Sequence, residues 1–231
     1  MANKEPCSGI RRPIVVGVID SGIDSALMSR VTVARDFTGS ADLGVTDSCG
    51  HGSAIAQSIL ANGAGYPVQL AVARVFGDRL TCPVERVVAA LDWLVACKVD
   101  IINMSFGLRT DYTALRDHCT QALACGINLI AASPAQGESV YPAAYPGVLR
   151  ATGDARCQQG QLSALHSGQA DFGGFAGDPS TDKVVGASRG CASVSGLAAR
   201  LLSQTKCNTD LVIALTQHAH YQGREYRRVA P

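Results

Sequence analysis

Short apolar runs alternate with amphipathic stretches along most of the chain. The apolar runs, which are typical of strands, lie at 14–19, 68–76, 99–104, 127–132, 147–152 and 183–186. The clearest helical pattern is 83–97, where apolar residues recur every three or four positions and Pro83 and Glu85 suit the first turn. Strands that alternate with helices predict an α/β fold, with a mostly parallel sheet and helices on both of its faces.

The same pattern predicts three more helices and one long irregular segment. We expect one helix to begin at His51, another to follow Ala192, and a short one to run from Asp210 to His218. Residues 153–182 are rich in Gly, Ser and Gln, which predicts an irregular surface segment.

Length and composition fit one domain. With 231 residues, of which 47% are hydrophobic, the chain can bury one sizeable core. We place this domain at residues 13–220, with an N-terminal tail at 1–12 and a C-terminal tail at 221–231. The formal charge of +1 gives no reason to expect a nucleic-acid partner, and no apolar run is long enough to cross a membrane. The pattern predicts no particular oligomeric state.

The cysteines indicate a reducing compartment. There are nine, an odd number, and several lie in apolar helical stretches where a free thiol behaves as a small hydrophobic group. The first residues lack the apolar core of a signal peptide, and no Cys-x-x-Cys pair suggests structural zinc. We therefore expect nine free thiols in a cytoplasmic protein.

Three separated segments contain residues suited to nucleophilic catalysis. An apolar run ends on Asp20 and a glycine turn, and Gly50-His51-Gly52 opens a small-residue helix. The third segment, Gly190-Cys191-Ala192-Ser193, enters another helix. A hydroxyl nucleophile needs an imidazole to accept its proton, and the imidazole needs a carboxylate to fix its tautomer. A strand that ends on Asp20 can place this carboxylate at the carboxyl edge of a parallel sheet.

In this order the segments resemble the catalytic Asp, His and Ser segments of the subtilisin-like serine peptidases. The resemblance covers about residues 13 to 203. It implies a single-domain, three-layer fold in which Asp20 orients His51. We expect no cofactor and assign no metal ligand, and calcium dependence stays open. By residue type, Asp20, Cys49 and His51 could also be three metal ligands, but the peptidase interpretation accounts better for Asp20 and His51.

At the position that matches the family's nucleophilic serine, this chain has Ala192. We therefore expect an inactivated Ser-to-Ala variant of a serine endopeptidase. Two other nucleophiles stay open: Ser193, if one residue is inserted, and Cys191 beside the position. A natural pseudopeptidase that binds peptides as a scaffold is the alternative function.

Further matches concern the substrate. The segment Asp100 to Gly107 resembles the family's substrate-binding strand, whose exposed edge pairs with an extended peptide. The resemblance implies that two short stretches contact the substrate. The second of them forms the primary pocket together with residues 141–146. These stretches are Ser105, Phe106 and Gly107, and Ala131, Ala132 and Ser133.

One departure from the family concerns the oxyanion. The family usually carries Ala-Ala-Gly-Asn-x-Gly, and its Asn side chain donates to the oxyanion, whereas residues 131–137 contain no Asn. Gln136 is the candidate replacement. With weak oxyanion support, and with no signal peptide or prodomain before the Asp strand, we expect narrow specificity. The resemblance extends to the leader-removing subtilisin-like proteins of modified-peptide pathways, which implies a peptide or protein precursor as partner.

Overall fold

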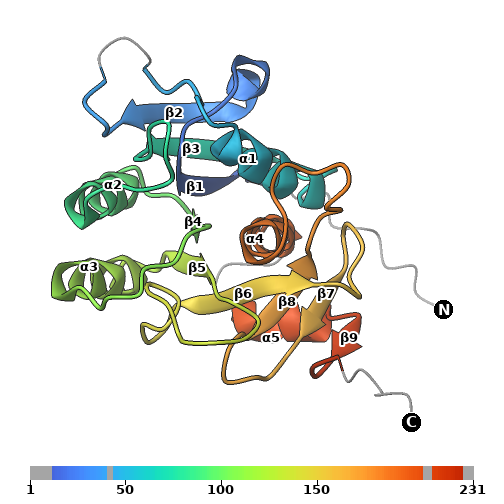
Figure 1. Ribbon diagram of the computed structural model, residues 1–231. Coiled ribbons are helices and arrows are strands. Elements are labelled where there is room, and N and C mark those ends of the chain that lie inside the picture. The colour runs from blue at the N-terminus through green and yellow to red at the C-terminus, as the bar shows by residue number, and fades with distance from the viewer. Residues whose placement is uncertain (1–11, 41–43, 205–209, 226–231) are drawn as a thin grey trace.

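In the computed structural model, which describes residues 12–40, 44–204 and 210–225, one mixed sheet runs through the whole molecule (Figure 1). Its strand order is β2-β3-β1-β4-β5-β6-β8-β7-β9. The strands are β1 (Ile14–Asp20), β2 (Val31–Asp36), β3 (Val68–Arg74), β4 (Ile101–Met104), β5 (Asn128–Ala132), β6 (Leu149–Asp154), β7 (Leu162–Ala164), β8 (Phe172–Phe175) and β9 (Tyr221–Gln222). All neighbours pair in parallel except β7 and β8, which pair antiparallel.

Helices cover both faces of this sheet, as Figure 1 shows. On one face lie α1 (His51–Asn62), α4 (Ala187–Gln204) and α5 (Leu211–Gln217), whose buried side chains join one core cluster. On the other face lie α2 (Val84–Ala96) and α3 (Thr113–Ala124), which form a second cluster. A short 3₁₀ helix, η1 (Ser25–Arg30), links β1 to β2. The predicted α/β class, with a mostly parallel sheet between helical layers, is confirmed.

The central strands are apolar throughout because both of their faces are covered. In β1 and in β3, six of the seven residues are buried, without the alternation of a half-exposed strand. Both faces of β1 are therefore covered by the two helical layers. No described helix is long and apolar enough to cross a membrane.

Glycines let α4 approach the sheet unusually closely. A Cβ on Gly190 would lie 2.1 Å from the carbonyl oxygen of Thr152 in β6. A Cβ on Gly174 in β8 would lie 2.8 Å from the carbonyl oxygen of Gly190. These distances leave no room for a side chain, so α4 is fixed against two strands at once.

The structure corrects several boundaries. Residues 183–186 form no strand, because the chain there turns into α4 through Gly186 at a φ of 74°. The segment 153–182 is not simply an irregular surface, because it contains the buried strands β7 and β8. Pairing of β9 with β7 continues the fold past the predicted domain end at residue 220. The tails at 1–11 and 226–231 lie outside the described residues.

Candidate active site

The predicted carboxylate and imidazole meet at the carboxyl end of β1. Asp20 is the last residue of that strand and is fully buried, and His51 is the first residue of α1. His51 Nδ1 lies 2.7 Å from Asp20 Oδ1, and 14% of the His51 side chain is exposed. Gly50 before it has a φ of 78°, in the left-handed region that glycine adopts without strain. This pair can hold an imidazole tautomer with Nε2 free as a base.

The surrounding charges favour a protonated imidazole. Burial lowers the pKa of His51, but the hydrogen bond and charge of Asp20, together with the charge of Asp47, outweigh it and raise the pKa above 6.5. His51 is therefore a stronger base than a free histidine.

The prediction that position 192 holds the nucleophile is wrong. Ala192 has no exposed surface and lies inside the core cluster between α4 and the sheet. The two alternatives meet the same obstacle, because Cys191 and Ser193 are also fully buried. α4 begins at Ala187, so residue 192 is already in its second turn, where it is buried. The inference of an inactivating Ser-to-Ala change therefore loses its basis.

Ser188, four residues earlier in the same segment, is not fully buried. It is the second residue of α4, follows the turn at Gly186, and is half-buried. Its hydroxyl donates to the carbonyl of Ser105 at 3.0 Å, and the Ser105 hydroxyl donates back to the carbonyl of Ser188 at 3.1 Å. Sequence reasoning missed Ser188, although Gly186-Ala187-Ser188 also has the Gly-x-Ser pattern of the family's nucleophile segment.

Strand register brings Ser188 to the same sheet edge as Asp20. In the pairing of β1 with β4, Val18 lies opposite Asn103. Two residues further along each strand stand Asp20 and Ser105, and Ser105 is the residue that holds Ser188. Carboxylate and hydroxyl thus belong to neighbouring strand ends.

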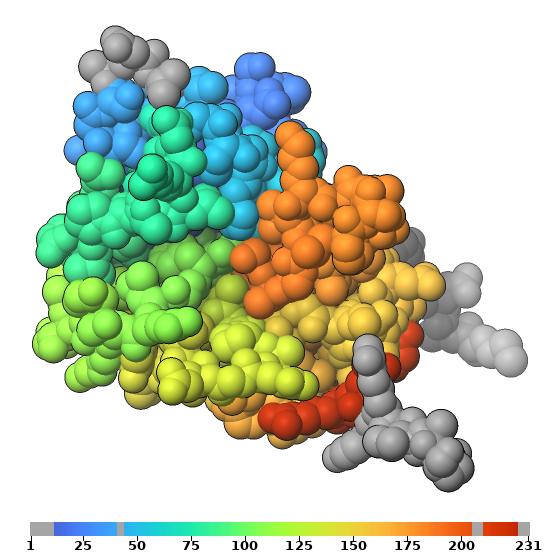
Figure 2. All heavy atoms as spheres, in the orientation of Figure 1, coloured from blue at the N-terminus to red at the C-terminus, as the bar shows by residue number. Residues whose placement is uncertain are grey.

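Helix register brings Ser188 level with His51. The Arg189 guanidinium donates to the carbonyl of Ala54 at 3.3 Å, and the hydroxyls of Ser193 and Ser58 lie 3.2 Å apart. Both contacts join residues 135 positions apart, so α1 and α4 run parallel and in step. Their first turns, which contain His51 and Ser188, consequently lie side by side. In Figure 2 the orange segment leading into α4 lies against the cyan segment of α1.

A buried amide supports the Ser105–Ser188 contact from below. The Asn103 side chain donates to the Ser105 hydroxyl at 3.0 Å and accepts from the Ser195 hydroxyl at 2.9 Å. The thiol of Cys191 lies 3.4 Å from the same amide oxygen. Burial raises the pKa of Cys191 to about 12, which excludes it as a thiolate nucleophile at neutral pH.

The expected substrate contacts are only partly accessible. β4 lies in the middle of the sheet, between β1 and β5, so the prediction that it is an exposed edge is wrong for the strand itself. Past its end, Ser105 is buried, Phe106 is half-buried against Phe76, and Gly107 is exposed. Ala131 and Ala132 are buried in the two core clusters, so their side chains are not free to touch a peptide.

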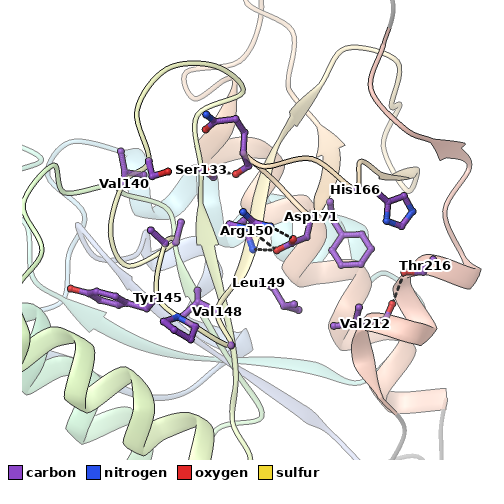
Figure 3. A pocket seen from close by; sticks show the side chains of 17 residues that line it. Ser133, Val140, Tyr145, Val148, Leu149, Arg150, His166, Asp171, Val212 and Thr216 are labelled. Carbon is purple, nitrogen blue, oxygen red and sulfur yellow. Dashed lines mark hydrogen bonds and ion pairs between the residues drawn. The ribbon is translucent and has the colours of Figure 1, made fainter.

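Ser133 lines a cavity of about 590 Å³ with residues from 139–150, the 166–172 region and α5. Figure 3 shows the Arg150–Asp171 pair in its wall, with Arg150 Nη2 2.5 Å from Asp171 Oδ1. Of the predicted pocket segments 130–133 and 141–146, Ser133 and residues 143–146 line this cavity. None of its lining residues belongs to the cluster of Asp20, His51 and Ser188, so this cavity is separate from that cluster.

Gln136 lines a different hollow. Together with Ala135 it faces Thr152, Gly153 and the C-terminal segment at Arg224 in a space of about 470 Å³. Its side chain is exposed.

The described cysteines are unpaired. All seven (Cys49, Cys82, Cys97, Cys119, Cys125, Cys157 and Cys191) are free thiols, while Cys7 and Cys207 lie outside the described residues. Among the residues described, no three His, Cys, Asp or Glu side chains are grouped so that they could hold a metal ion.

Comparisons with known proteins show the family of this chain. Residues 11–219 match the model of the Subtilase family. The chain is 31% identical over 149 residues to the minor extracellular protease Epr of Bacillus subtilis (strain 168), covering 59% of this chain and 22% of that protein. It is 29% identical over 157 residues to the major intracellular serine protease of the same strain, covering 59% of this chain and 49% of that protein. The alignments thus span half or less of these relatives.

A solved structure shares the fold. The crystal structure of a cold adapted subtilisin-like serine proteinase superposes with a TM-score of 0.67 at 20% identity, over 88% of this chain and 80% of that one. The subtilisin-like architecture predicted from the sequence is therefore confirmed at the level of fold.

Proposed function

Because this chain belongs to the subtilase family, we propose that it is an active serine endopeptidase with Ser188 as nucleophile, His51 as general base and Asp20 as the orienting carboxylate. The observation that carries the proposal is the convergence of Ser188, half-buried at the first turn of α4, with the Asp20–His51 pair at one sheet edge. The pseudopeptidase alternative rested on Ala192 together with the missing oxyanion Asn. Ala192 is buried in the core, so only the missing Asn still supports that alternative.

The reaction is acyl transfer. In the structure the Ser188 hydroxyl donates to Ser105, so rotation of its side chain must first turn the proton toward His51 Nε2. His51 then accepts that proton while Ser188 Oγ bonds to the peptide carbonyl carbon, and Asp20 stabilises the imidazolium. The imidazolium returns the proton to the leaving amine as the peptide bond breaks. Water, deprotonated by His51, releases the acyl group in the second half of the cycle.

The N-terminus of α4 supplies oxyanion stabilisation. The first bond of the helix runs from the N–H of Gly190 to the carbonyl of Gly186, so the N–H groups of residues 187–189 precede it. Such N–H groups point out of the helix end and, with its dipole, attract negative charge. We assign the Ser188 N–H to the oxyanion and propose Gln136 as a second donor.

The proposed substrate is a peptide or protein precursor from which one leader is removed, in the cytoplasm. Residues 131–137 contain no Asn, and loss of such a side-chain donor costs on the order of a hundred- to a thousandfold in turnover (the measured example is from subtilisin, a relative). A slow enzyme suits one cut per partner better than general degradation. A precursor of the kind represented by the small crosslinked subunit of quinohemoprotein amine dehydrogenase is the specific candidate.

Labelling tests the nucleophile. A serine-directed fluorophosphonate should modify the chain at Ser188, as located by mass spectrometry of peptides. Ser188→Ala should abolish labelling and hydrolysis, whereas Ser193→Ala should keep both. Labelling at any other serine would contradict the assignment, and no labelling of folded protein would contradict the peptidase itself.

Substrate breadth is a separate test. Casein and precursors encoded beside the gene are incubated with the enzyme, and products are mapped by mass spectrometry. One clean cut in a neighbouring precursor, with casein intact, is the expected result. Degradation of casein at many sites would reject the dedicated substrate while leaving the peptidase proposal standing.

A further inference from the structure

A second carboxylate, that of Asp47, lies in the turn before His51 and accepts most of the hydrogen bonds that shape the start of α1. Asp47 Oδ1 accepts from the backbone N–H of Gly50 at 2.8 Å and of Cys49 at 3.3 Å. Asp47 Oδ2 accepts from the N–H and hydroxyl of Ser53, at 2.7 and 2.6 Å. These donors flank His51 on both sides, so Asp47 fixes the backbone from which the imidazole projects.

Ser21 ties this carboxylate to the end of β1. Its hydroxyl lies 2.8 Å from Asp47 Oδ1 and 3.2 Å from Asp20 Oδ1, and it accepts from the N–H of Gly52 at 2.9 Å. The backbones also meet directly, because a Cβ on Gly52 would lie 2.3 Å from the carbonyl oxygen of Gly22. Strand end, turn and helix start therefore form one rigid unit around the Asp20–His51 pair.

We infer that Asp47 is a positioning residue for His51, which holds the imidazole on Asp20 through the 49–53 turn and through Ser21, and places a second negative charge near the ring. Its effect on catalysis rests on the proposed function, but its effect on His51 itself does not. Asp47 is never in contact with the reacting atoms in this scheme.

The charges near His51 come from four segments of the chain. Asp20 belongs to β1 and Asp47 to the turn before α1. The ammonium of Lys183 lies 3.7 Å from the point that a Cβ on Gly50 would occupy. Arg189, in α4, donates from Nη1 to the carbonyl oxygen of Ala54, and its Nη2 lies 3.6 Å from Asp182 Oδ1.

Two of these carboxylates act directly on the imidazole. Burial raises the pKa of Asp47, but hydrogen bonds from Ser53, Ser21 and Gly50 outweigh it and lower the pKa below 3.8, so Asp47 stays charged while His51 titrates. Its negative charge adds to that of Asp20 in stabilising the imidazolium. Removal of the Asp47 charge should therefore lower the pKa of His51.

Asp47→Asn tests the charge, because it keeps the side-chain shape and one acceptor oxygen. The pKa of His51 is followed by NMR titration of its ring Cε1 proton, assigned with His51→Gln. Asp210→Asn is the matched control, since Asp210 also caps a helix, accepting from the N–H of Val212 and Ile213 in α5. We expect a lower pKa of His51 in Asp47→Asn and the parent value in Asp210→Asn. An unchanged pKa in folded Asp47→Asn would overturn the electrostatic part.

Ser21→Ala tests the geometric part and provides a second route if Asp47→Asn does not fold. It removes the hydroxyl bridge but keeps both carboxylates. The expected result is faster solvent exchange of the His51 Nδ1 proton, with kcat reduced about ten- to a hundredfold and KM unchanged. Unchanged exchange and unchanged kcat would overturn the positioning role. If neither the parent nor any variant cleaves a peptide, the proposed function is wrong. The NMR results then still show whether Asp47 positions His51.

Discussion

Gly190→Ala is a small substitution with a large expected effect, because the Cβ has no space. Gly190 lies two residues after Ser188, on the side of α4 that touches β6. The added carbon would lie 2.1 Å from the carbonyl oxygen of Thr152, 2.3 Å from its carbonyl carbon and 2.5 Å from the nitrogen of Gly153. All three neighbours are backbone atoms in the interior of a sheet, so none can rotate away.

Two opposing effects set the magnitude. Alanine favours a helix over glycine by about 1 kcal/mol. An ordinary van der Waals contact of a Cβ begins at 3.4 Å, whereas the added Cβ would lie 2.1 Å from the Thr152 oxygen. α4 and β6 must therefore separate by about 1.3 Å. Overpacking of a rigid core costs about 1–3 kcal/mol, and a clash with backbone belongs at the upper end. The net loss is about 2 kcal/mol, which for a chain of this length lowers Tm by about 4–8 °C.

The same shift moves the start of α4, so kcat/KM should fall by on the order of a hundredfold. Calorimetry and hydrolysis of a cleaved peptide measure the two effects, with Gly77→Ala as control, because a Cβ at Gly77 meets nothing within 4 Å. Parent-like Tm and kcat/KM in Gly190→Ala would refute the reasoning that close approach of α4 to β6 positions Ser188.

Four further outcomes follow from the structure. Ala192→Ser should leave the labelled residue unchanged and cost about 1–2 kcal/mol of unfolding free energy by chemical denaturation, because its hydroxyl enters the buried core. Since the pKa of His51 is raised above 6.5, hydrolysis should fall as the pH drops through the raised value, in a pH–rate profile. The pH dependence of stability runs in the opposite direction. The His51–Asp20 interaction stabilises the fold fully below pH 6.5, and this contribution disappears as the pH rises through the pKa of His51 in the folded protein. Denaturation at several pH values measures it. A thiol reagent should modify exposed Cys49 in the native protein, but fully buried Cys191 only after unfolding.

The sequence predicts those elements whose local pattern and burial agree. β1 and α1 are examples, because a continuous apolar run and a glycine-flanked helix start both survive packing. β8 is the contrary case: its sequence Phe-Gly-Gly-Phe is poor for a strand, yet Gly174 is required there because α4 lies against it. Its strand character depends on a helix that is remote in sequence, which no local pattern reveals.

The nucleophile could not be placed from the sequence for a related reason. Residues 186–192 contain two Gly-x-(Ser or Ala) triplets, ending on Ser188 and Ala192, four residues and about one helical turn apart. Both satisfy the same small-residue pattern. Only the depth at which the sheet covers α4 distinguishes them, since it buries residue 192 fully and leaves Ser188 at the helix start. The Asp20–His51 pair needed no such knowledge, because each residue ends or begins an element.

The central position of α4 also determines when this chain could become an enzyme. α4 contacts β1, β4, β5, β6 and β8 as well as α1, and it is the last long helix among the residues that the structure describes. During synthesis, Asp20 and His51 emerge early, while the proposed nucleophile emerges only after the whole strand array up to β8. A truncated or partly folded chain thus has a base without a hydroxyl to activate. On the proposed assignment, hydrolysis therefore requires that β8 and α4 have been made and have joined the sheet.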